Sequence, residues 1–262
     1  MSWFRLLASL AVVFAPAVCA EVRLLKFAGA PEFRMGSVTS KRFVSPDMGA
    51  RRLTLNFSLS QPGNEFAQHT HDDCDDTILM FEGIAELRQG DKRTSFKPGQ
   101  AVFVPGGQIH GTITGNVVST MISFQTPPDK ALYSGARDSS RPGAAPPKGV
   151  ITPGAVKYID FGGKHGFFVH PGMGARRVAV AQWKMRPGEK IAATVPKDGE
   201  QVLFVWKGSI SVTSKSGSLK VLSKDAVFTS GPETFEFRND SAGEAIVIQA
   251  QAPPVAGWEK TR

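Results

Sequence analysis

The sequence predicts an all-β protein made of two tandem barrels. Short apolar stretches that alternate with polar residues recur between turns rich in Gly and Pro, a pattern typical of β-barrels and β-sandwiches. No window keeps a helical period over three turns. With 262 residues and 41% hydrophobic side chains, the chain can bury one large core or two small ones.

An internal repeat accounts for the number of barrels. The segment FVSPDMGARR at 43–52 returns as FVHPGMGARR at 168–177, with eight of ten positions identical. The offset of 125 residues continues without a gap, so that Gly63 corresponds to Gly188 and Gly83 to Gly208. Such a repeat indicates two copies of one supersecondary unit.

Each copy predicts a similar succession of short strands. In the first copy they are LTLNFSL at 53–59, TILMF at 77–81, IAELR at 84–88, AVFV at 101–104 and VVSTMISF at 117–124. In the second they are RVAVAQWKM at 177–185, QVLFVW at 201–206, SISVTS at 209–214, LKVL at 219–222, AVFTS at 226–230 and EAIVIQA at 244–250.

The expected division of the chain has four parts. Residues 21–133 form the first barrel and residues 156–262 the second. The segment 134–155, rich in Gly, Pro and Ser, predicts a linker between them. Residues 1–20 precede both barrels.

The N-terminus has the composition of a secretory signal peptide. Arg5 supplies a positive charge, residues 6–14 form a short apolar stretch, and small residues precede Glu21. We therefore expect cleavage near Ala20 and a secreted or periplasmic protein. The apolar stretch is too short to span a membrane, and no later segment is long and apolar enough to do so.

Charge and cysteine content exclude some classes of function. The formal net charge is +8, but the Lys and Arg residues are scattered rather than gathered with aromatic residues, which argues against nucleic-acid binding. Cleavage would leave Cys74 as the single cysteine, so an intramolecular disulfide is excluded. Its acidic neighbours disfavour the thiolate, and we expect a passive residue.

Two histidines at alternate positions mark a candidate metal site. Because residues i and i+2 of an extended strand share a face, His69 and His71 can both reach one ion. Asp76 opens the next apolar stretch, and His110 follows a segment punctuated by Gly and Pro. Imidazoles and a carboxylate are ligands that divalent transition metals accept.

The spacing G-x5-H-x-H-x4-acid-x6-G, followed by G-x5-P-x-G-x2-H, resembles the paired motifs of the cupin superfamily. In cupins these motifs build one side of a small antiparallel barrel, the double-stranded β-helix or jelly roll, in which three histidines and a carboxylate hold a divalent metal. The resemblance places His69, His71 and His110 on the histidine positions and Asp76 where the family usually has Glu. It implies a two-domain cupin, or bicupin.

The carboxylate leaves two alternatives open. Asp is one methylene shorter than Glu, so Asp76 could fall short of the ion and leave an open three-histidine site, as zinc enzymes have. Asp75 would take its place if the register moved by one residue. Thr114 stands where the second motif usually ends in Asn.

The repeat supplies a control for the ligand set. At the offset of 125 residues, the four positions carry Thr194, Pro196, Gln201 and Phe235 in the second copy. The glycines and the apolar framework persist there, so the ligands are separable from the fold. We therefore expect metal binding in the first barrel alone.

The surroundings of Asp76 predict an apolar pocket. Ile78 and Met80 share its strand face and should form part of a wall that favours a small, partly apolar ligand. The ion expected is one divalent transition metal, Fe(II) or Mn(II) first, with Zn(II), Ni(II) or Cu(II) as alternatives.

Several functions suit this pattern. The first is an enzyme acting on a small organic acid or carbonyl compound, an oxygenase of the dioxygenase type (an oxidoreductase) or a decarboxylase, as the resemblance implies. The alternatives are a non-catalytic metal-dependent binding protein and a non-redox isomerase or hydrolase. A monomer and a homodimer are both compatible with two barrels in one chain, because two barrels already mimic a cupin dimer.

Overall fold

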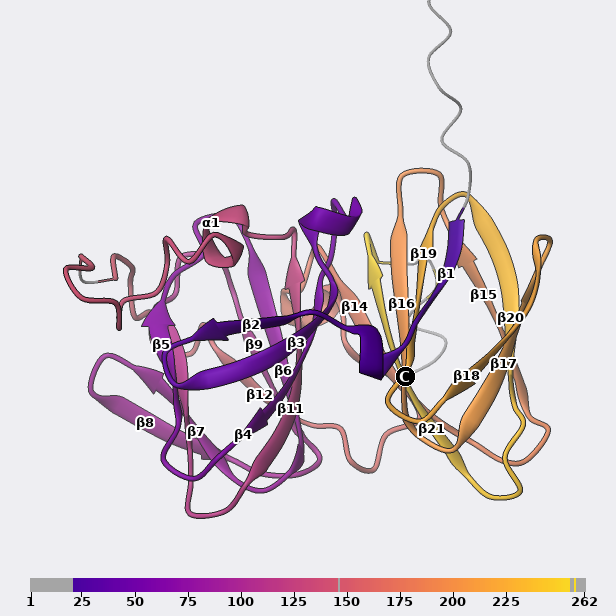
Figure 1. Ribbon diagram of the computed structural model, residues 1–262, viewed down its shortest axis with the longest axis horizontal. Helices are drawn as coiled ribbons and strands as arrows, with labels where there is room; N and C mark the ends of the chain where they lie inside the picture. Colours follow the sequence, from indigo (N-terminus) through magenta and orange to yellow (C-terminus); the bar gives the residue numbers. More distant parts are fainter. Residues whose placement is uncertain (1–20, 146, 255–256, 258–262) are drawn as a thin grey trace, which may run out of the picture.

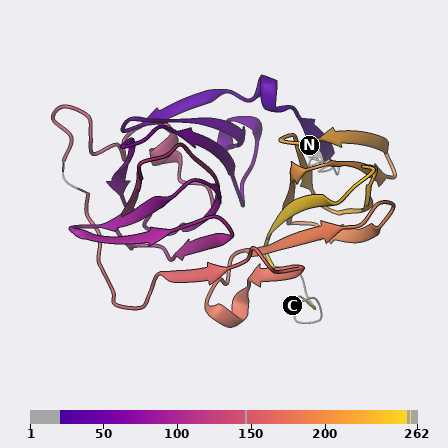
Figure 2. The ribbon, with the colours of Figure 1, turned by 90° about the horizontal axis from the view of Figure 1, so that it is seen from below.

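The computed structural model describes residues 21–145, 147–254 and 257, and within them it shows two β-barrels side by side (Figures 1 and 2). The predicted signal peptide, residues 1–20, lies outside the described residues. Every pair of named strands is antiparallel, as expected for barrels joined by short turns. The only α-helix among the described residues is α1 (Lys130–Tyr133).

The first barrel consists of a seven-stranded and a four-stranded sheet, in the orders β12-β9-β6-β11-β4-β3-β2 and β5-β10-β7-β8. Its strands are β2 (Glu32–Met35), β3 (Val38–Val44), β4 (Leu55–Ser60), β5 (Glu65–His69), β6 (Asp75–Glu82), β7 (Ala85–Gln89), β8 (Lys92–Phe96), β9 (Gln100–Val104), β10 (His110–Thr114), β11 (Ser119–Thr126) and β12 (Lys157–Asp160).

The second barrel repeats this plan with a six-stranded and a four-stranded sheet, in the orders β1-β19-β16-β21-β14-β13 and β15-β20-β17-β18. Its strands are β1 (Glu21–Leu25), β13 (Gly166–Val169), β14 (Ala179–Met185), β15 (Lys190–Val195), β16 (Glu200–Lys207), β17 (Ser209–Ser214), β18 (Gly217–Leu222), β19 (Ala226–Ser230), β20 (Glu233–Asn239) and β21 (Ala245–Ala252).

The repeated glycines occupy turns that a side chain would not fit. Gly83 and Gly208 follow β6 and β16 with φ values of 76° and 80°. A Cβ on Gly83 would lie 2.2 Å from the carbonyl oxygen of Val118, and one on Gly208 would lie 3.0 Å from Cα of Ala245. Glycine is required at such positions because only it adopts this backbone conformation freely.

The barrels exchange their first strands, which the expected division of the chain did not include. Strand β1 pairs with β19 of the second barrel, with Leu25 opposite Ala226. Strand β12 pairs with β9 of the first barrel, with Ile159 opposite Ala101. Residues 21–25 therefore belong to the second barrel and residues 157–160 to the first, because each completes the edge of the other sheet.

A shared core joins the two barrels. It contains Phe43 and Phe57 from the first barrel, and Phe204 of the second lies 6.0 Å and 6.2 Å from their ring centroids. Phe81 stacks on Trp206 at 4.2 Å. Aromatic pairs of this kind bury large areas and stabilise the contact.

Equivalent carboxylates also link the barrels. Glu200 accepts hydrogen bonds from the backbone N–H groups of Arg51, Arg52 and Leu53 at 2.8, 2.9 and 3.3 Å. Its counterpart in the repeat, Asp75, accepts one from Nη1 of Arg177 at 3.1 Å. Each barrel therefore contributes one carboxylate that accepts hydrogen bonds from the other barrel.

Candidate metal centre

Three strands bring the four predicted ligands together. His69 ends β5, His110 begins β10 directly opposite it, and Asp76 lies near the start of β6. His71 follows β5 by two residues. One ligand atom from each of the four side chains lies within 4.8 Å of the others, and all four residues are buried.

Hydrogen bonds determine which imidazole nitrogens face the centre. Nδ1 of His69 donates to the carbonyl of Ala67 at 2.8 Å, and Nδ1 of His110 donates to that of Gln108 at 3.0 Å. Nδ1 of His71 is 2.8 Å from a carboxylate oxygen of Asp129. With the proton on Nδ1, the Nε2 lone pair of each ring is available to a metal ion.

The Nε2 atoms of His69 and His71 are 3.0 Å apart in a buried setting. Two lone pairs at that distance repel unless a positive charge lies beside both. Two nitrogens that bind one ion at about 2.1 Å and at a right angle are ~3.0 Å apart. The spacing therefore fits a transition metal.

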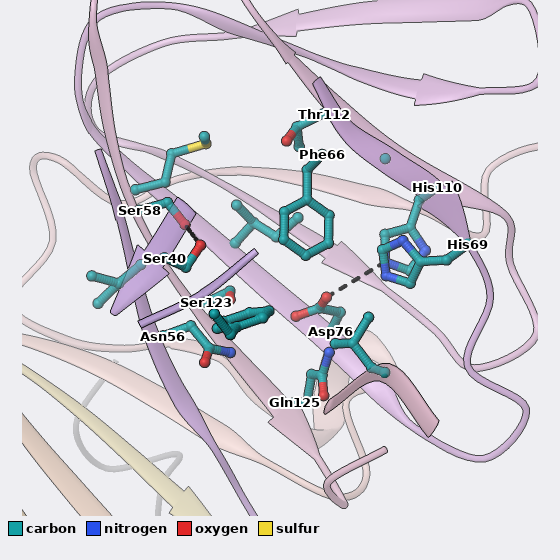
Figure 3. A pocket seen from close by; sticks show the side chains of 16 residues that line it. Ser40, Asn56, Ser58, Phe66, His69, Asp76, His110, Thr112, Ser123 and Gln125 are labelled. Carbon is teal, nitrogen blue, oxygen red and sulfur yellow. Dashed lines mark hydrogen bonds and ion pairs between the residues drawn. The ribbon is translucent and has the colours of Figure 1, made fainter. Parts of the chain in front are cut away.

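The carboxylate of Asp76 reaches the same group. Its Oδ2 lies 3.4 Å from Nε2 of His110 (Figure 3). The same oxygen lies 3.8 Å from Nε2 of His71. Its Oδ1 is buried and has no hydrogen-bond partner among the described residues. Asp75 instead accepts from Arg177 and from the backbone N–H of Gly106. The one-residue shift in register does not occur.

Two residues at the centre were not expected from the sequence. Asp129 holds His71 and also caps α1, since its Oδ1 accepts from the N–H of Ala131 at 2.8 Å. Gln125 lies opposite Asp76 on β11, with its Nε2 3.3 Å from Nε2 of His71. The helix cap was the only local signal for Asp129, and nothing local distinguished Gln125.

The charges of these groups follow from their surroundings. Burial, and then the neighbouring His110 and His71, lower the pKa of His69 well below its ordinary value of 6.5. Burial opposes ionisation of Asp129, but the hydrogen bond and charge of His71, together with Arg137, outweigh it and lower its pKa to about 2. At neutral pH the centre therefore combines a neutral imidazole at His69 with an ionised carboxylate at Asp129.

Cys74 takes no part in this arrangement. It is a buried free cysteine, and burial, reinforced by Asp129 and Asp76, raises the pKa of its thiol to about 12. A thiol of this kind is a poor nucleophile and a poor metal ligand at neutral pH.

A cavity of about 40 Å³ opens beside His69, Asp76 and His110 (Figure 3). Phe33, Phe66, Ile78 and Met121 give it apolar walls, and Asn56 adds a polar group. Met80, predicted for the same wall as Ile78, is not among the lining residues, because it is fully buried in the hydrophobic cluster of this barrel. The described residues that line the cavity include no Lys, Arg, Glu, Tyr or Cys.

The segment expected to be a linker covers the mouth of the centre. A larger groove of about 490 Å³ is lined by His69 and by residues between 135 and 148. Arg137 holds this segment in place through ion pairs with Asp129 at 3.0 Å and Asp72 at 3.1 Å. His69 borders both the groove and the inner cavity.

The second barrel has no comparable group among the described residues. Thr194 is exposed, and Phe235 is buried in a cluster with Trp183 and Phe237. Gln201 is fully buried on β16 at the position of Asp76. Large apolar side chains therefore fill the interior where the first barrel has imidazoles.

The comparisons with known proteins agree with this fold. The family described as Cupin domain matches residues 57–120, the part of the chain that carries the four side chains. No curated protein is significantly similar in sequence. Among the described residues, no helix is long and apolar enough to cross a membrane.

Solved structures with the same fold extend over most of the chain. The bacterial pirin YhhW of Escherichia coli, in complex with nickel(II), has a TM-score of 0.67 at 15% identity, covering 90% of this chain and 100% of that chain. Oxalate decarboxylase of Lactobacillus farciminis, in a formate complex, has a TM-score of 0.65 at 12% identity, covering 88% and 86%.

A third structure, oxalate decarboxylase of Bacillus subtilis with Mn(II) centres, has a TM-score of 0.65 at 9% identity, covering 87% and 76%. At these identities the likeness concerns the fold. The prediction of an all-β chain built from antiparallel barrels is confirmed, and the donor set supports a site for a divalent metal.

Proposed function

We propose that this chain is a secreted bicupin metalloenzyme that acts on a small organic acid or carbonyl compound, as an oxygenase or a decarboxylase. The observation that carries the proposal is the convergence of three Nε2 atoms, each with its Nδ1 hydrogen-bonded, and one carboxylate beside a small cavity. Metal binding would then belong to the first barrel alone, as the replacements in the second barrel suggest.

The residues that would hold the ion are His69, His71, Asp76 and His110. A divalent ion with redox chemistry, Fe(II) or Mn(II), would supply Lewis acidity and electron transfer at the mouth of the cavity. The chain's own residues would position the ligands and the substrate. Asp129 orients His71, the apolar walls exclude water, and the small volume orients a bound molecule.

The composition of the cavity favours an oxygenase within this proposal. Hydrolysis and isomerisation normally need a positioned acid or base, and decarboxylation needs a proton for the carbon that loses carbon dioxide. Apart from the predicted ligands themselves, the described lining contains no group that titrates near neutral pH. The chain's own residues are therefore suited to binding and orienting a substrate whose chemistry the ion supplies.

The proposal is tested by turnover of the metal-loaded protein. Oxygen uptake with diketones or phenols would identify an oxygenase, and release of carbon dioxide from small acids would identify a decarboxylase. The double variant His69→Ala/His71→Ala serves as the inactive control, and Thr194→Ala, at the position of His69 in the second barrel, as the active one. Hydrolysis or isomerisation without redox change would contradict the proposal.

A non-catalytic binding protein is the second candidate. The burial of all four side chains favours it, because a buried site retains a ligand longer than an open one. Tight ligand binding without turnover in the presence of Fe(II), Mn(II), Zn(II), Ni(II) or Cu(II) would identify this function.

Export is part of the proposal. The first twenty residues have the composition of a signal peptide, so the mature chain would begin at Glu21, the first residue of β1. N-terminal sequencing of the protein recovered from the periplasm or medium tests this. A cytoplasmic protein that retains Met1 or Ser2 would contradict it.

A further inference from the structure

A side chain of the second barrel reaches the strand that carries Asp76. Nη1 of Arg177 donates to Oδ1 of Asp75 at 3.1 Å, although the two residues are 102 positions apart in the chain. Asp75 is the first residue of β6, is 7% exposed, and immediately precedes the predicted ligand. The contact therefore joins the second barrel to the start of a ligand-bearing strand of the first.

The same oxygen of Asp75 also holds the loop between β9 and β10, residues 105–109. It accepts a hydrogen bond from the backbone N–H of Gly106 at 3.1 Å. The next residue, Gly107, donates its N–H to the carbonyl of His71 at 2.6 Å. The loop thus contacts the backbone of one predicted ligand and leads directly into another, the first residue of β10.

Two donors on one carboxylate oxygen restrict the segments that carry them, because hydrogen bonds to an ionised acceptor are stronger than those between neutral groups. Asp76 follows Asp75 on β6, and His110 follows the loop. The ligand atoms of Asp76 and His110 are 3.4 Å apart (Figure 3). A shift of the loop against β6 would change that distance, and a metal site requires its ligands to be held closely in place.

The repeat separates the two contacts of this carboxylate. At the offset of 125 residues, Asp75 corresponds to Glu200 and Gly106 to Gly231. Glu200 also accepts hydrogen bonds from the other barrel. The N–H of Gly231, however, donates to the carbonyl of Gly199 at 3.0 Å. Both carboxylates therefore contact the opposite barrel, but in the second copy a backbone carbonyl takes the place of the carboxylate at the loop.

The shared core fixes the backbone around Arg177. Ala175 and Val178 are fully buried in this core, and their counterparts in the first copy, Ala50 and Leu53, belong to the same cluster. The side chain of Arg177 extends from this anchored segment and is 45% exposed. Its guanidinium therefore offers β6 a donor at a fixed place.

We propose that Arg177 is a positioning residue for the metal centre of the first barrel. Through Asp75 it fixes the loop 105–109 against β6, so that Asp76 and His110 are held at the separation that one ion requires. This inference rests on the proposed function, because it concerns the predicted ligands of that ion. It adds a function for the second barrel, which would support the centre without providing a ligand.

The affinity for Mn(II) and the electron paramagnetic resonance spectrum of the bound ion test this proposal. Arg177→Gln should weaken Mn(II) binding about tenfold, as the loss of a hydrogen bond to a charged group would. It should also change the zero-field splitting of the bound ion, because the ligands shift. Arg177→Lys keeps the positive charge and should recover part of the affinity.

Arg52→Gln is the matched control. Arg52 has the same place in the first copy, and it contacts Glu200 through its backbone N–H, which the substitution keeps. We expect wild-type Mn(II) affinity and a wild-type spectrum from this variant.

A double-variant cycle tests whether Arg177 acts through Asp75. Asp75→Asn keeps an oxygen that can accept from Gly106 but removes the charge that Arg177 contacts, and it should weaken Mn(II) binding. Adding Arg177→Gln to Asp75→Asn should then cause little further loss of affinity.

The outcomes distinguish this inference from the proposed function. Wild-type Mn(II) affinity and spectrum in Arg177→Gln, an equal loss in Arg52→Gln, or additive losses in the double variant would overturn the inference and leave the proposed function intact. If Arg177→Gln does not fold, wild-type Mn(II) affinity in Asp75→Asn has the same meaning. A wild-type chain that binds neither Mn(II) nor Fe(II) would overturn both.

Discussion

Oδ2 of Asp129 accepts a hydrogen bond of 2.8 Å from Nδ1 of His71, although 58 residues separate the two in the chain. The same carboxylate accepts a hydrogen bond of 3.0 Å from Nε of Arg137, and it caps α1 by accepting one from the backbone N–H of Ala131. One side chain thus connects a predicted ligand, the helix that follows β11, and the segment that covers the mouth of the centre.

The first prediction concerns this carboxylate. Asp129→Ala should lower metal affinity about 10–100-fold, because His71 loses the partner that orients its ring. Asp129→Asn keeps an acceptor and a good helix cap, so we expect a smaller loss. Competition with a chromophoric chelator measures both. Equal affinity in the alanine variant would show that His71 is oriented by other contacts.

The second prediction concerns the ligands themselves. His69→Ala, His71→Ala and His110→Ala should each reduce the metal content of the purified chain from one ion toward none. The repeat supplies the control, since Thr194→Ala changes the position equivalent to His69 where no cluster is found among the described residues. Elemental analysis gives the result. Metal retained by all three histidine variants would place the ion elsewhere.

The third prediction concerns pH. His69 has a lowered pKa in the folded chain, so the unfolded chain binds more protons below pH 6.5. The stability from its neutral form is complete above pH 6.5 and is lost as pH falls toward the folded-state pKa. Without a metal ion, the free energy of unfolding should fall by up to about 1.4 kcal/mol per pH unit from this residue.

Urea denaturation at pH 7.5, 6.0 and 5.0 measures this dependence. His69→Gln removes the titrating group and should flatten the profile over the same range, with the other groups unchanged. A variant profile as steep as that of the wild type would show that other residues cause the pH dependence.

The fourth prediction concerns the contact between the barrels. Glu200 is 2% exposed and accepts from three backbone N–H groups of the first barrel. Glu200→Ala should lower the free energy of unfolding by about 3 kcal/mol, because it leaves those donors without their partner.

Glu236→Ala is the matched control for this contact. Glu236 pairs with Lys190 at 2.8 Å on the surface, and both side chains are about half exposed (44% and 55%). Its loss should change stability by less than about 1 kcal/mol. Similar effects of the two substitutions in chemical denaturation would mean that the Glu200 contact adds little to the joining of the barrels.

Much of the fold could be predicted because the repeat compares the chain with itself. Gly83 and Gly208 persist since both turns need a positive φ, whereas His110 and Phe235 differ since the backbone at their position accepts different buried side chains. The four candidate ligands were predicted from strand parity and motif spacing, and the structure brings them together. That they bind metal is still a prediction.

The exchange of β1 and β12 could not be predicted in the same way. A short apolar strand such as Val22 to Leu25 has a pattern that suits either sheet, and only the open edges of the folded barrels select its partner. For the same reason, the segment 134–155 looked like a spacer, although its backbone and Arg137 pack over the centre.

The sequence alone determined the fold class, the two copies and the four residues that meet, because these depend on local periodicity and on spacing within one strand pair. The tertiary structure alone decided which groups surround them. Asp129 reaches His71, and Gln125 comes to lie opposite Asp76, through contacts between segments that are far apart in the chain. Contacts between residues so far apart in the sequence depend on how the whole barrel packs, and a local sequence pattern does not predict that packing.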